Sequence, residues 1–251
     1  MSSNTPLLTN KVALVTGSAK RLGAASVKAL HAAGANVVVH YDQSHDESQN
    51  LIREMNELRA GSAVSVGTEL GTRYQAQWLV EQASRYWNRL DILVNNASSF
   101  FPTPLGTISD SDVVDLMASN VSAPLFLIQA AQAELTKSEG SILNMVDIHG
   151  FKPYKNHVVY CAAKAALVMI TLSMASELAP HIRVNGIAPG AILWPEDGSL
   201  DAEQQRLKIA EVPLGHQGTP EDIAKLVVYL SSDAAKFITG EIIKVDGGKS
   251  I

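Results

Sequence analysis

Short runs of valine, isoleucine and leucine alternate with helical patterns along this chain of 251 residues. Runs so short and so uniformly apolar are typical of strands in a parallel sheet that helices cover on both faces. They predict strands at 12–16, 36–40, 63–66, 91–95, 141–146, 182–188 and 242–245. The alternation predicts an α/β fold, a single Rossmann-type domain over residues 1–251 with a doubly wound parallel sheet of about seven strands.

The segments between these runs predict helices at 21–33, 46–59, 73–87, 109–137, 154–179 and 220–231. Ser109 is a suitable N-cap, with Asp112 three residues later. Pro220 suits the first position of its helix. The longest irregular stretch, 189–218, is rich in proline and glycine. We expect a substrate loop around 190–218 that covers a site, with a floppy surface loop as the alternative.

Composition restricts the partners and the compartment. The formal net charge is −5 and no basic block occurs, which argues against nucleic acid or an anionic membrane as a partner. Cys161 is the single cysteine, so an intramolecular disulfide is excluded and a reducing compartment is favoured. The first ten residues lack the pattern of a signal peptide, and we expect no segment to approach a membrane span. These features predict a cytoplasmic protein.

Tyr160 and Lys164 are four residues apart on a predicted helix, so their side chains can point into one site. A phenol has a pKa of about 10, and a nearby cation lowers that pKa. A tyrosine tuned in this way can give a proton to an oxygen or nitrogen as hydride arrives on the neighbouring carbon. Taken alone, the pair is also compatible with a solvated helix surface.

A glycine turn follows the first predicted strand, where Gly17 and Gly23 flank Ser18 to Leu22. Gly17 permits a tight turn, and Gly23 permits close packing of the following helix. The free N–H groups at that helix start favour a phosphate, as in a dinucleotide site. The structural alternative is a turn that binds no ligand.

Six motifs in this order resemble the short-chain dehydrogenase/reductase family over nearly the whole chain. They are the glycine turn Thr16-Gly17 to Gly23, Asn95-Asn96-Ala97-Ser98, Asn120, Tyr160 with Lys164, Pro189-Gly190, and Asp246-Gly247-Gly248. The resemblance implies hydride transfer with a nicotinamide nucleotide. It implies that Tyr160 donates the proton, that Lys164 grips the nicotinamide ribose, and that Asn120 holds a water in a proton relay.

Within the family, the chain is similar to the pteridine reductase subgroup. Arg21 stands where many members have a second glycine, and the segment 97–104 and Asp147 also match. Aspartate replaces the usual serine thirteen residues before Tyr160. The resemblance implies NADPH-dependent reduction of a dihydropterin, such as dihydrobiopterin, dihydromonapterin or dihydrofolate, to the tetrahydro form.

The pterin interpretation gives specific roles to four side chains. Phe100 would stack on the flat ring, and Asp147 would supply a second proton donor or position a water. Arg21 would bind the pyrophosphate or lie near the pterin, and Ser98 would contact the pterin or a phosphate. The alternatives are a core residue for Phe100, a strand-end cap for Asp147 and a solvated charge for Arg21.

Coenzyme choice is set just after the second strand. Asp42 there favours NADH, because an aspartate accepts a hydrogen bond from a ribose 2′-hydroxyl and repels a phosphate. Lys20 and Arg21 bring positive charge nearby, and His40 and Ser44 can donate hydrogen bonds. We predict NADPH, with NADH as the alternative because of Asp42. The remaining predicted coenzyme contacts are Leu22, Tyr41, Glu69, Leu70, Asn96, Ala97, Pro189 and Gly190.

Two further features complete the expectations. The histidines at 149, 157, 181 and 216 show no tight metal-ligand spacing, so no metal site is predicted. The helix around Tyr160 is apolar on more than one face, which predicts cover by a partner subunit or by the chain's own loop. The family resemblance suggests a homotetramer. Two other functions stay open: reduction of a carbonyl substrate (a sugar, steroid or acyl thioester), and nucleotide binding without catalysis.

Overall fold

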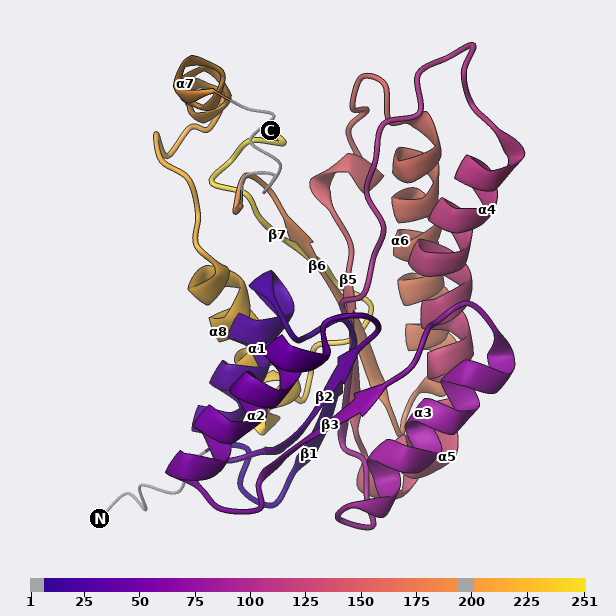
Figure 1. Ribbon diagram of the computed structural model, residues 1–251, viewed down its shortest axis with the longest axis vertical. Helices are drawn as coiled ribbons and strands as arrows, with labels where there is room; N and C mark the ends of the chain where they lie inside the picture. Colours follow the sequence, from indigo (N-terminus) through magenta and orange to yellow (C-terminus); the bar gives the residue numbers. More distant parts are fainter. Residues whose placement is uncertain (1–6, 194–200) are drawn as a thin grey trace.

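The computed structural model describes residues 7–193 and 201–251, and it contains a parallel sheet in the order β3-β2-β1-β4-β5-β6-β7 (Figure 1). The strands are β1 (Val12–Val15), β2 (Asn36–Tyr41), β3 (Ala63–Gly67), β4 (Ile92–Asn95), β5 (Ser141–Met145), β6 (Arg183–Pro189) and β7 (Ile242–Val245). The predicted doubly wound α/β fold with seven strands is confirmed. The strand order reverses between β1 and β4, and ligands of such sheets bind outside the strand ends at that point.

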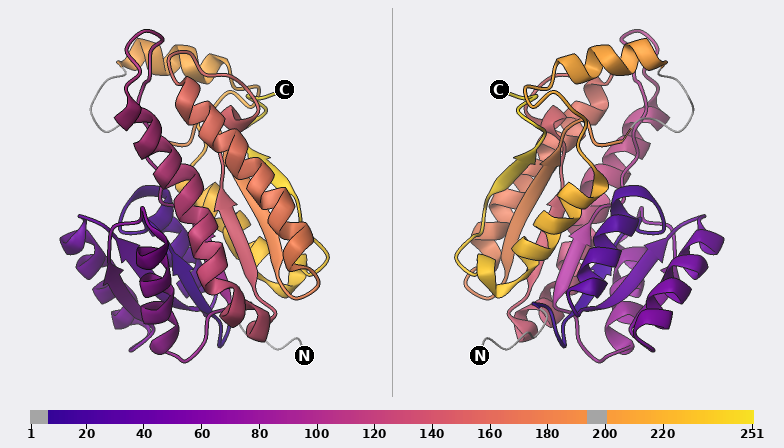
Figure 2. Two further views of the ribbon diagram at one scale, coloured as in Figure 1. Left: turned by 90° about the vertical axis from the view of Figure 1, so that its right-hand side faces the viewer. Right: turned by 90° about the vertical axis from the view of Figure 1, so that its left-hand side faces the viewer.

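Helices cover both faces of the sheet, as Figures 1 and 2 show. One face carries α1 (Arg21–Ala32), α2 (His45–Leu58) and α8 (Pro220–Ser231). The other carries α3 (Arg73–Arg85), α4 (Asp110–Met117), α5 (Ala123–Ser138) and α6 (Val158–Leu178). The central strands β1, β4 and β5 are fully buried, and each buried valine or leucine side chain contributes about 1.5–3 kcal/mol relative to exposure.

Two predicted helix starts are confirmed by their caps. The Ser109 hydroxyl accepts a hydrogen bond from the Asp112 N–H, and the Asp112 carboxylate accepts one from the Ser109 N–H. Before α8, the Asp222 carboxylate accepts hydrogen bonds from the N–H and the hydroxyl of Thr219, and Pro220 takes the first position of the helix. Reciprocal capping satisfies N–H groups that a helix start leaves without an internal partner.

The single helix predicted at 109–137 is wrong, because the structure divides it. A π-helical turn, η1 (Ala118–Ser122), separates α4 from α5. Pro124 has no N–H, so it cannot donate the helical bond to the carbonyl four residues earlier, which belongs to Asn120. Such turns are frequent at functional sites, and this one holds Asn120.

The helix predicted from residue 154 begins instead at Val158, because Asn156 has a left-handed φ of 63°. Residues 155 and 156 form a turn between two aromatic side chains, Tyr154 and His157. The stretch 189–218 is not wholly irregular either. It contains α7 (Ala202–Ala210), with a capping box formed by Asp201 and Gln204, at the end of the molecule where the C-terminus lies (Figure 1). Part of the expected loop, 194–200, lies outside the described residues.

Two helical stretches, Asp110–Ser138 and Val158–Leu178, are long and apolar enough to cross a membrane by composition alone. The expectation that no segment approaches such a span is therefore wrong. Both stretches lie against the sheet, where Leu127, Leu135 and Leu167 belong to the buried core. A helix that covers a buried parallel sheet must itself be apolar, which explains why these two stretches are as long and apolar as a membrane span.

Candidate active site

Tyr160 and Asp147 meet at the carboxyl end of the sheet. The Tyr160 hydroxyl donates a hydrogen bond of 2.9 Å to Oδ2 of Asp147. Tyr160 comes from the first turn of α6 and is 4% exposed, while Asp147 follows β5 and is half-buried. The resemblance to pteridine reductases predicted this convergence, and the structure brings the two groups into direct contact.

Asp147 is a strand-end cap, as one of the two sequence-based alternatives predicted, and it also contacts Tyr160. Its Oδ1 accepts a hydrogen bond from the His149 N–H at 2.8 Å and caps the short helical turn η2 (Ile148–Gly150). Its Oδ2 faces Tyr160. The cap fixes the orientation of the carboxylate, and the second oxygen is thereby directed at the phenol.

Lys164 lies one helical turn after Tyr160 and is fully enclosed. Its ammonium donates to the Met145 carbonyl at 2.9 Å and lies 5.7 Å from the centroid of the Tyr160 ring. Burial lowers the pKa of Lys164 to about 8, although the Asp147 charge opposes that shift. The pKa of Tyr160 is raised well above its usual value, first by burial and then by the adjacent carboxylate. The expected lowering by Lys164 is therefore wrong for this arrangement, and the phenol stays protonated.

Asn120 is buried in the π-helical turn η1, which packs against α6. Its amide nitrogen donates to the carbonyls of Leu116 and Ser99, both at 3.0 Å. Its oxygen Oδ1 is buried without a protein partner. A buried acceptor of this kind requires a hydrogen-bond donor, such as a water molecule, to satisfy it. The arrangement fits the predicted relay water.

Two positions of the glycine turn, Gly17 and Gly23, have no space for a side chain. Gly17 has φ +59°, and a Cβ there would lie 2.9 Å from Cα of Ala97. A Cβ on Gly23 would lie 2.6 Å from the Gly17 carbonyl oxygen. The Asn96 amide donates to the carbonyls of Thr16 and Gly17, so the end of β4 is tied to this turn. The close backbone approach fits a dinucleotide phosphate beside the start of α1.

His40 has a different role from the predicted one. Its Nδ1 accepts from the Gly17 N–H at 3.0 Å, so its Nε2 carries the proton and donates to the Thr68 carbonyl at 2.9 Å. Burial lowers its pKa to about 4, against smaller opposing effects of the Thr68 carbonyl and the Asp42 charge. Both ring nitrogens are therefore engaged within the protein, and His40 shapes the glycine turn instead of donating to the coenzyme.

Four predicted coenzyme contacts, Gly17, Lys20, Tyr41 and Ser44, line a hollow of about 350 Å³ beside the turn. It is lined by Gly17, Ala19, Lys20, Tyr41, Asp42, Gln43 and Ser44. Arg21, at the start of α1, has a left-handed φ of 54°, a conformation that costs a non-glycine residue about 1–2 kcal/mol. Strain of this kind is typical of functional positions.

The remaining predicted contacts differ in their surroundings. Glu69 and Ser98 are exposed, and Leu70 packs against the core cluster under α3. Leu22 packs against the cluster under α1. Pro189 ends β6, and the next residue, Gly190, donates to the Val245 carbonyl at 3.0 Å.

A cluster of rings lies beside Tyr160. The Phe100 ring, half exposed, stacks on His157 with centroids 4.8 Å apart and meets Tyr160 edge-on at 4.8 Å. Tyr154 lies between His157 and His149, with centroids 4.4 and 4.5 Å away. Phe100 is thus a neighbour of the phenol, not a core residue. The sequence analysis missed Tyr154 and His157, although their place between Asp147 and Tyr160 was a usable signal.

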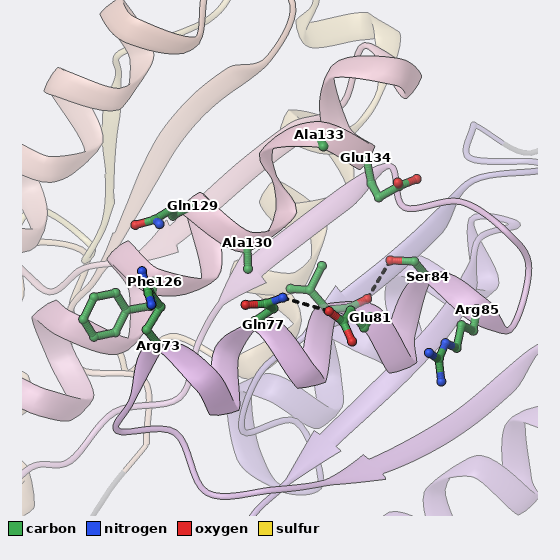
Figure 3. Close-up of a pocket in the computed structure, with 11 residues that line it drawn as sticks. Arg73, Gln77, Glu81, Ser84, Arg85, Phe126, Gln129, Ala130, Ala133 and Glu134 are labelled. Carbon is green, nitrogen blue, oxygen red and sulfur yellow. Dashed lines mark hydrogen bonds between the residues drawn. The ribbon is translucent and has the colours of Figure 1, made fainter.

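Helix α7 also reaches this ring cluster. Lys208 of α7 donates to the Tyr154 hydroxyl at 3.2 Å, and its ammonium lies 5.3 Å from the centroid of that ring. A second hollow, of about 590 Å³, lies elsewhere, between α3 and α5 (Figure 3). Its lining includes Arg73, Gln77 and Gln129, and none of the residues discussed above. Within residues 7–193 and 201–251, no three potential metal ligands gather.

Comparison with known proteins decides the family. The family model described as enoyl-(acyl carrier protein) reductase matches residues 17–250. The chain belongs to the short-chain dehydrogenase/reductase family. It is 37% identical to pteridine reductase 1 of Leishmania tarentolae, over 97% of both chains. It is 30% identical to a 3-oxoacyl-[acyl-carrier-protein] reductase of Thermotoga maritima, over 96% of this chain and 98% of that protein.

A solved structure has the same architecture. It is a blue fluorescent protein from a metagenomic library in complex with NADPH. The TM-score is 0.91 with 32% identity, and the match covers 98% of this chain and 100% of the other. The chain is therefore a nicotinamide-dependent oxidoreductase of this family. Its relatives include carbonyl reductases as well as a pteridine reductase, so the family alone does not specify the substrate.

Proposed function

We propose that this enzyme reduces a dihydropterin to the tetrahydro form with NADPH. The observation that carries the proposal is the 2.9 Å hydrogen bond between the Tyr160 hydroxyl and Oδ2 of Asp147. Reduction of a C=N bond leaves a nitrogen that must gain a proton, and a phenol paired with a carboxyl group suits this task. A serine in place of Asp147 would suit the polarisation of a carbonyl.

The chain's own residues manage the proton. A bound nicotinamide coenzyme supplies the hydride to the carbon of the C=N bond. Tyr160 gives its proton to the adjacent nitrogen, which becomes strongly basic as the carbon is reduced, so a phenol with a raised pKa can still protonate it. Asp147 holds the hydroxyl in position through Oδ2. Lys164 and a water on the buried Oδ1 of Asn120 return a proton to the phenol.

The substrate side of the site suits a flat aromatic ring. Phe100 is half exposed next to Tyr160, and the stack of Phe100 on His157 presents an aromatic surface there. Offset stacking on such a ring adds about 0.5–1.5 kcal/mol beyond the buried area. Arg21 and Ser98 then contact the pterin or the coenzyme phosphates. Dihydrobiopterin, dihydromonapterin and dihydrofolate are the candidate substrates.

Support for NADPH comes from the positive charges of Lys20 and Arg21 at the glycine turn. Lys20 lines the hollow where the adenosine ribose belongs in this fold. Asp42 lines the same hollow and favours NADH, so the preference for NADPH rests on the balance of these charges. His40 does not contribute to this preference, since both of its ring nitrogens are bonded within the protein.

A spectrophotometric assay tests the reaction. Oxidation of NADPH and of NADH is followed with dihydrobiopterin, dihydrofolate and a panel of ketones. Turnover of a dihydropterin with NADPH is expected. Turnover of ketones alone would reject the proposal in favour of a carbonyl reductase, and nucleotide binding without turnover of either class would favour a binding protein. In the variant Asp147→Ser, we expect kcat/KM for the pterin to fall while the coenzyme Kd is retained.

We also propose that the enzyme is a homotetramer. Val158, Met169 and Leu172 on α6 are 56%, 60% and 39% exposed, so this apolar helix presents a second face that the described residues do not cover. Light scattering after gel filtration should give about four times the chain mass of 26.8 kDa. Met169→Glu should shift the protein to a smaller species. A wild-type monomer would contradict this proposal.

A further inference from the structure

The hollow beside the glycine turn contains a lysine, Lys20, that already forms an ion pair with a glutamate of the chain. Lys20, immediately before α1, lines this hollow of about 350 Å³ together with residues that follow β2. Its ammonium also forms an ion pair of 2.6 Å with Oε1 of Glu47, in the first turn of α2. Because β1 and β2 are paired neighbours, the two segments that follow them meet at the same edge of the sheet.

This edge is where the adenosine ribose of a dinucleotide lies in folds of this type. NADPH and NADH differ there by one phosphate on the ribose 2′-oxygen. A 2′-phosphate requires a cation, whereas a 2′-hydroxyl requires only a hydrogen-bond acceptor. Lys20 is the cation of the hollow lining, and Asp42 in the same lining is the acceptor.

We propose that Glu47 is a coenzyme-specificity residue that competes with the 2′-phosphate for Lys20. A phosphate that enters the hollow must take the Lys20 ammonium from the Glu47 carboxylate. A 2′-hydroxyl makes no such demand, so the ion pair persists when NADH binds and Asp42 accepts the hydrogen bond. Glu47 thereby weakens NADPH binding selectively and lets the enzyme accept both coenzymes.

Other nearby groups do not replace Lys20 in this competition. His40 is neutral at physiological pH and bonded through both ring nitrogens, so it adds no positive charge. Arg21 follows Lys20 and adds positive charge at the turn, but it is present in every variant compared below. Of the proposed function, this inference requires only that the protein binds a nicotinamide nucleotide. It does not depend on the pterin.

The experiment measures the equilibrium Kd of NADP⁺ and NAD⁺ by isothermal titration calorimetry, without substrate. The proteins are the wild type, Glu47→Gln, Lys20→Gln and the double variant. Glu47→Gln should tighten NADP⁺ binding by about two- to fivefold and leave NAD⁺ binding within about 1.5-fold. Lys20→Gln should weaken NADP⁺ binding by about tenfold. In the Lys20→Gln background, Glu47→Gln should change the NADP⁺ Kd by less than about twofold.

The chain offers a matched control. Lys28 and Glu54 form a second ion pair between α1 and α2, at 2.8 Å and with similar exposure, outside the hollow lining. Glu54→Gln should leave both dissociation constants unchanged.

Three results would overturn the inference. The first is that Glu47→Gln leaves the ratio of the NADP⁺ Kd to the NAD⁺ Kd unchanged. The second is that Glu54→Gln changes the NADP⁺ Kd as much as Glu47→Gln does. The third is that Glu47→Gln tightens NADP⁺ binding just as much when Lys20 has been replaced by Gln. In each case both nucleotides still bind, so the proposed reductase function stands. If neither nucleotide binds the wild type, both proposals fail.

Discussion

His40 is expected to make the stability of the protein, and of its glycine turn, sensitive to acid, and burial of the ring determines the size of the effect. The buried ring is neutral in the folded state, with a pKa of about 4, because desolvation opposes its charge. In the unfolded chain, histidine has a pKa of about 6.5. Between these values the unfolded state binds a proton that the folded state does not bind, so the free energy of unfolding falls as the pH falls.

The loss begins near pH 6.5 and is complete just below pH 4. Each pH unit in this window is worth about 1.4 kcal/mol, so the full shift from His40 corresponds to about 3 kcal/mol. From pH 7 to pH 4.5 the expected loss is about 2.5 kcal/mol. A protonated His40 would also present a donor to the Gly17 N–H, so the hydrogen bond that fixes the turn would be lost.

Urea unfolding at several pH values measures this effect. The wild type is compared with His40→Gln, which cannot titrate, and with His216→Gln, which removes an exposed histidine. Between pH 7 and pH 4.5, the wild type should lose about 2.5 kcal/mol more than His40→Gln does. Coenzyme affinity should fall over the same range in the wild type. Equal pH slopes for the wild type and His40→Gln would refute the reasoning.

Three further predictions test the site. Tyr160→Phe keeps the ring but removes the proton, so kcat should fall by at least about a hundredfold while the coenzyme Kd stays within about twofold; retained turnover would exclude the phenol as donor. Gly23→Val places side-chain atoms against the Gly17 carbonyl, so calorimetry should show coenzyme binding that is at least about tenfold weaker. Urea unfolding should show a loss of about 1–3 kcal/mol in the free energy of unfolding. Lys164 is charged below its pKa of about 8, so kcat for the pterin should decline as the pH rises through that value, and a flat profile to pH 10 would remove its charge from the mechanism.

The sequence by itself determined the sheet, the glycine turn and the meeting of Asp147 with Tyr160. Apolar runs at regular intervals specify buried parallel strands, because each strand is enclosed on both faces and tolerates little else. Asp147 and Tyr160 were predictable as partners from the resemblance to pteridine reductases, in which an aspartate lies thirteen residues before the tyrosine. Capping residues such as Ser109 act within three positions of the chain, so local sequence was sufficient to place that helix start.

Only the tertiary structure decided what surrounds those groups. His40 looked like a free donor, but Gly17 and Thr68, distant in sequence, occupy its ring nitrogens. The sign of the shift in the Tyr160 pKa depends on burial and on contact with Asp147, and spacing along a helix reveals neither. The pair Lys20–Glu47 joins two helices across the edge of the sheet. Desolvation and long-range contacts depend on the complete packing of the chain, whereas periodicity and caps depend only on neighbouring residues.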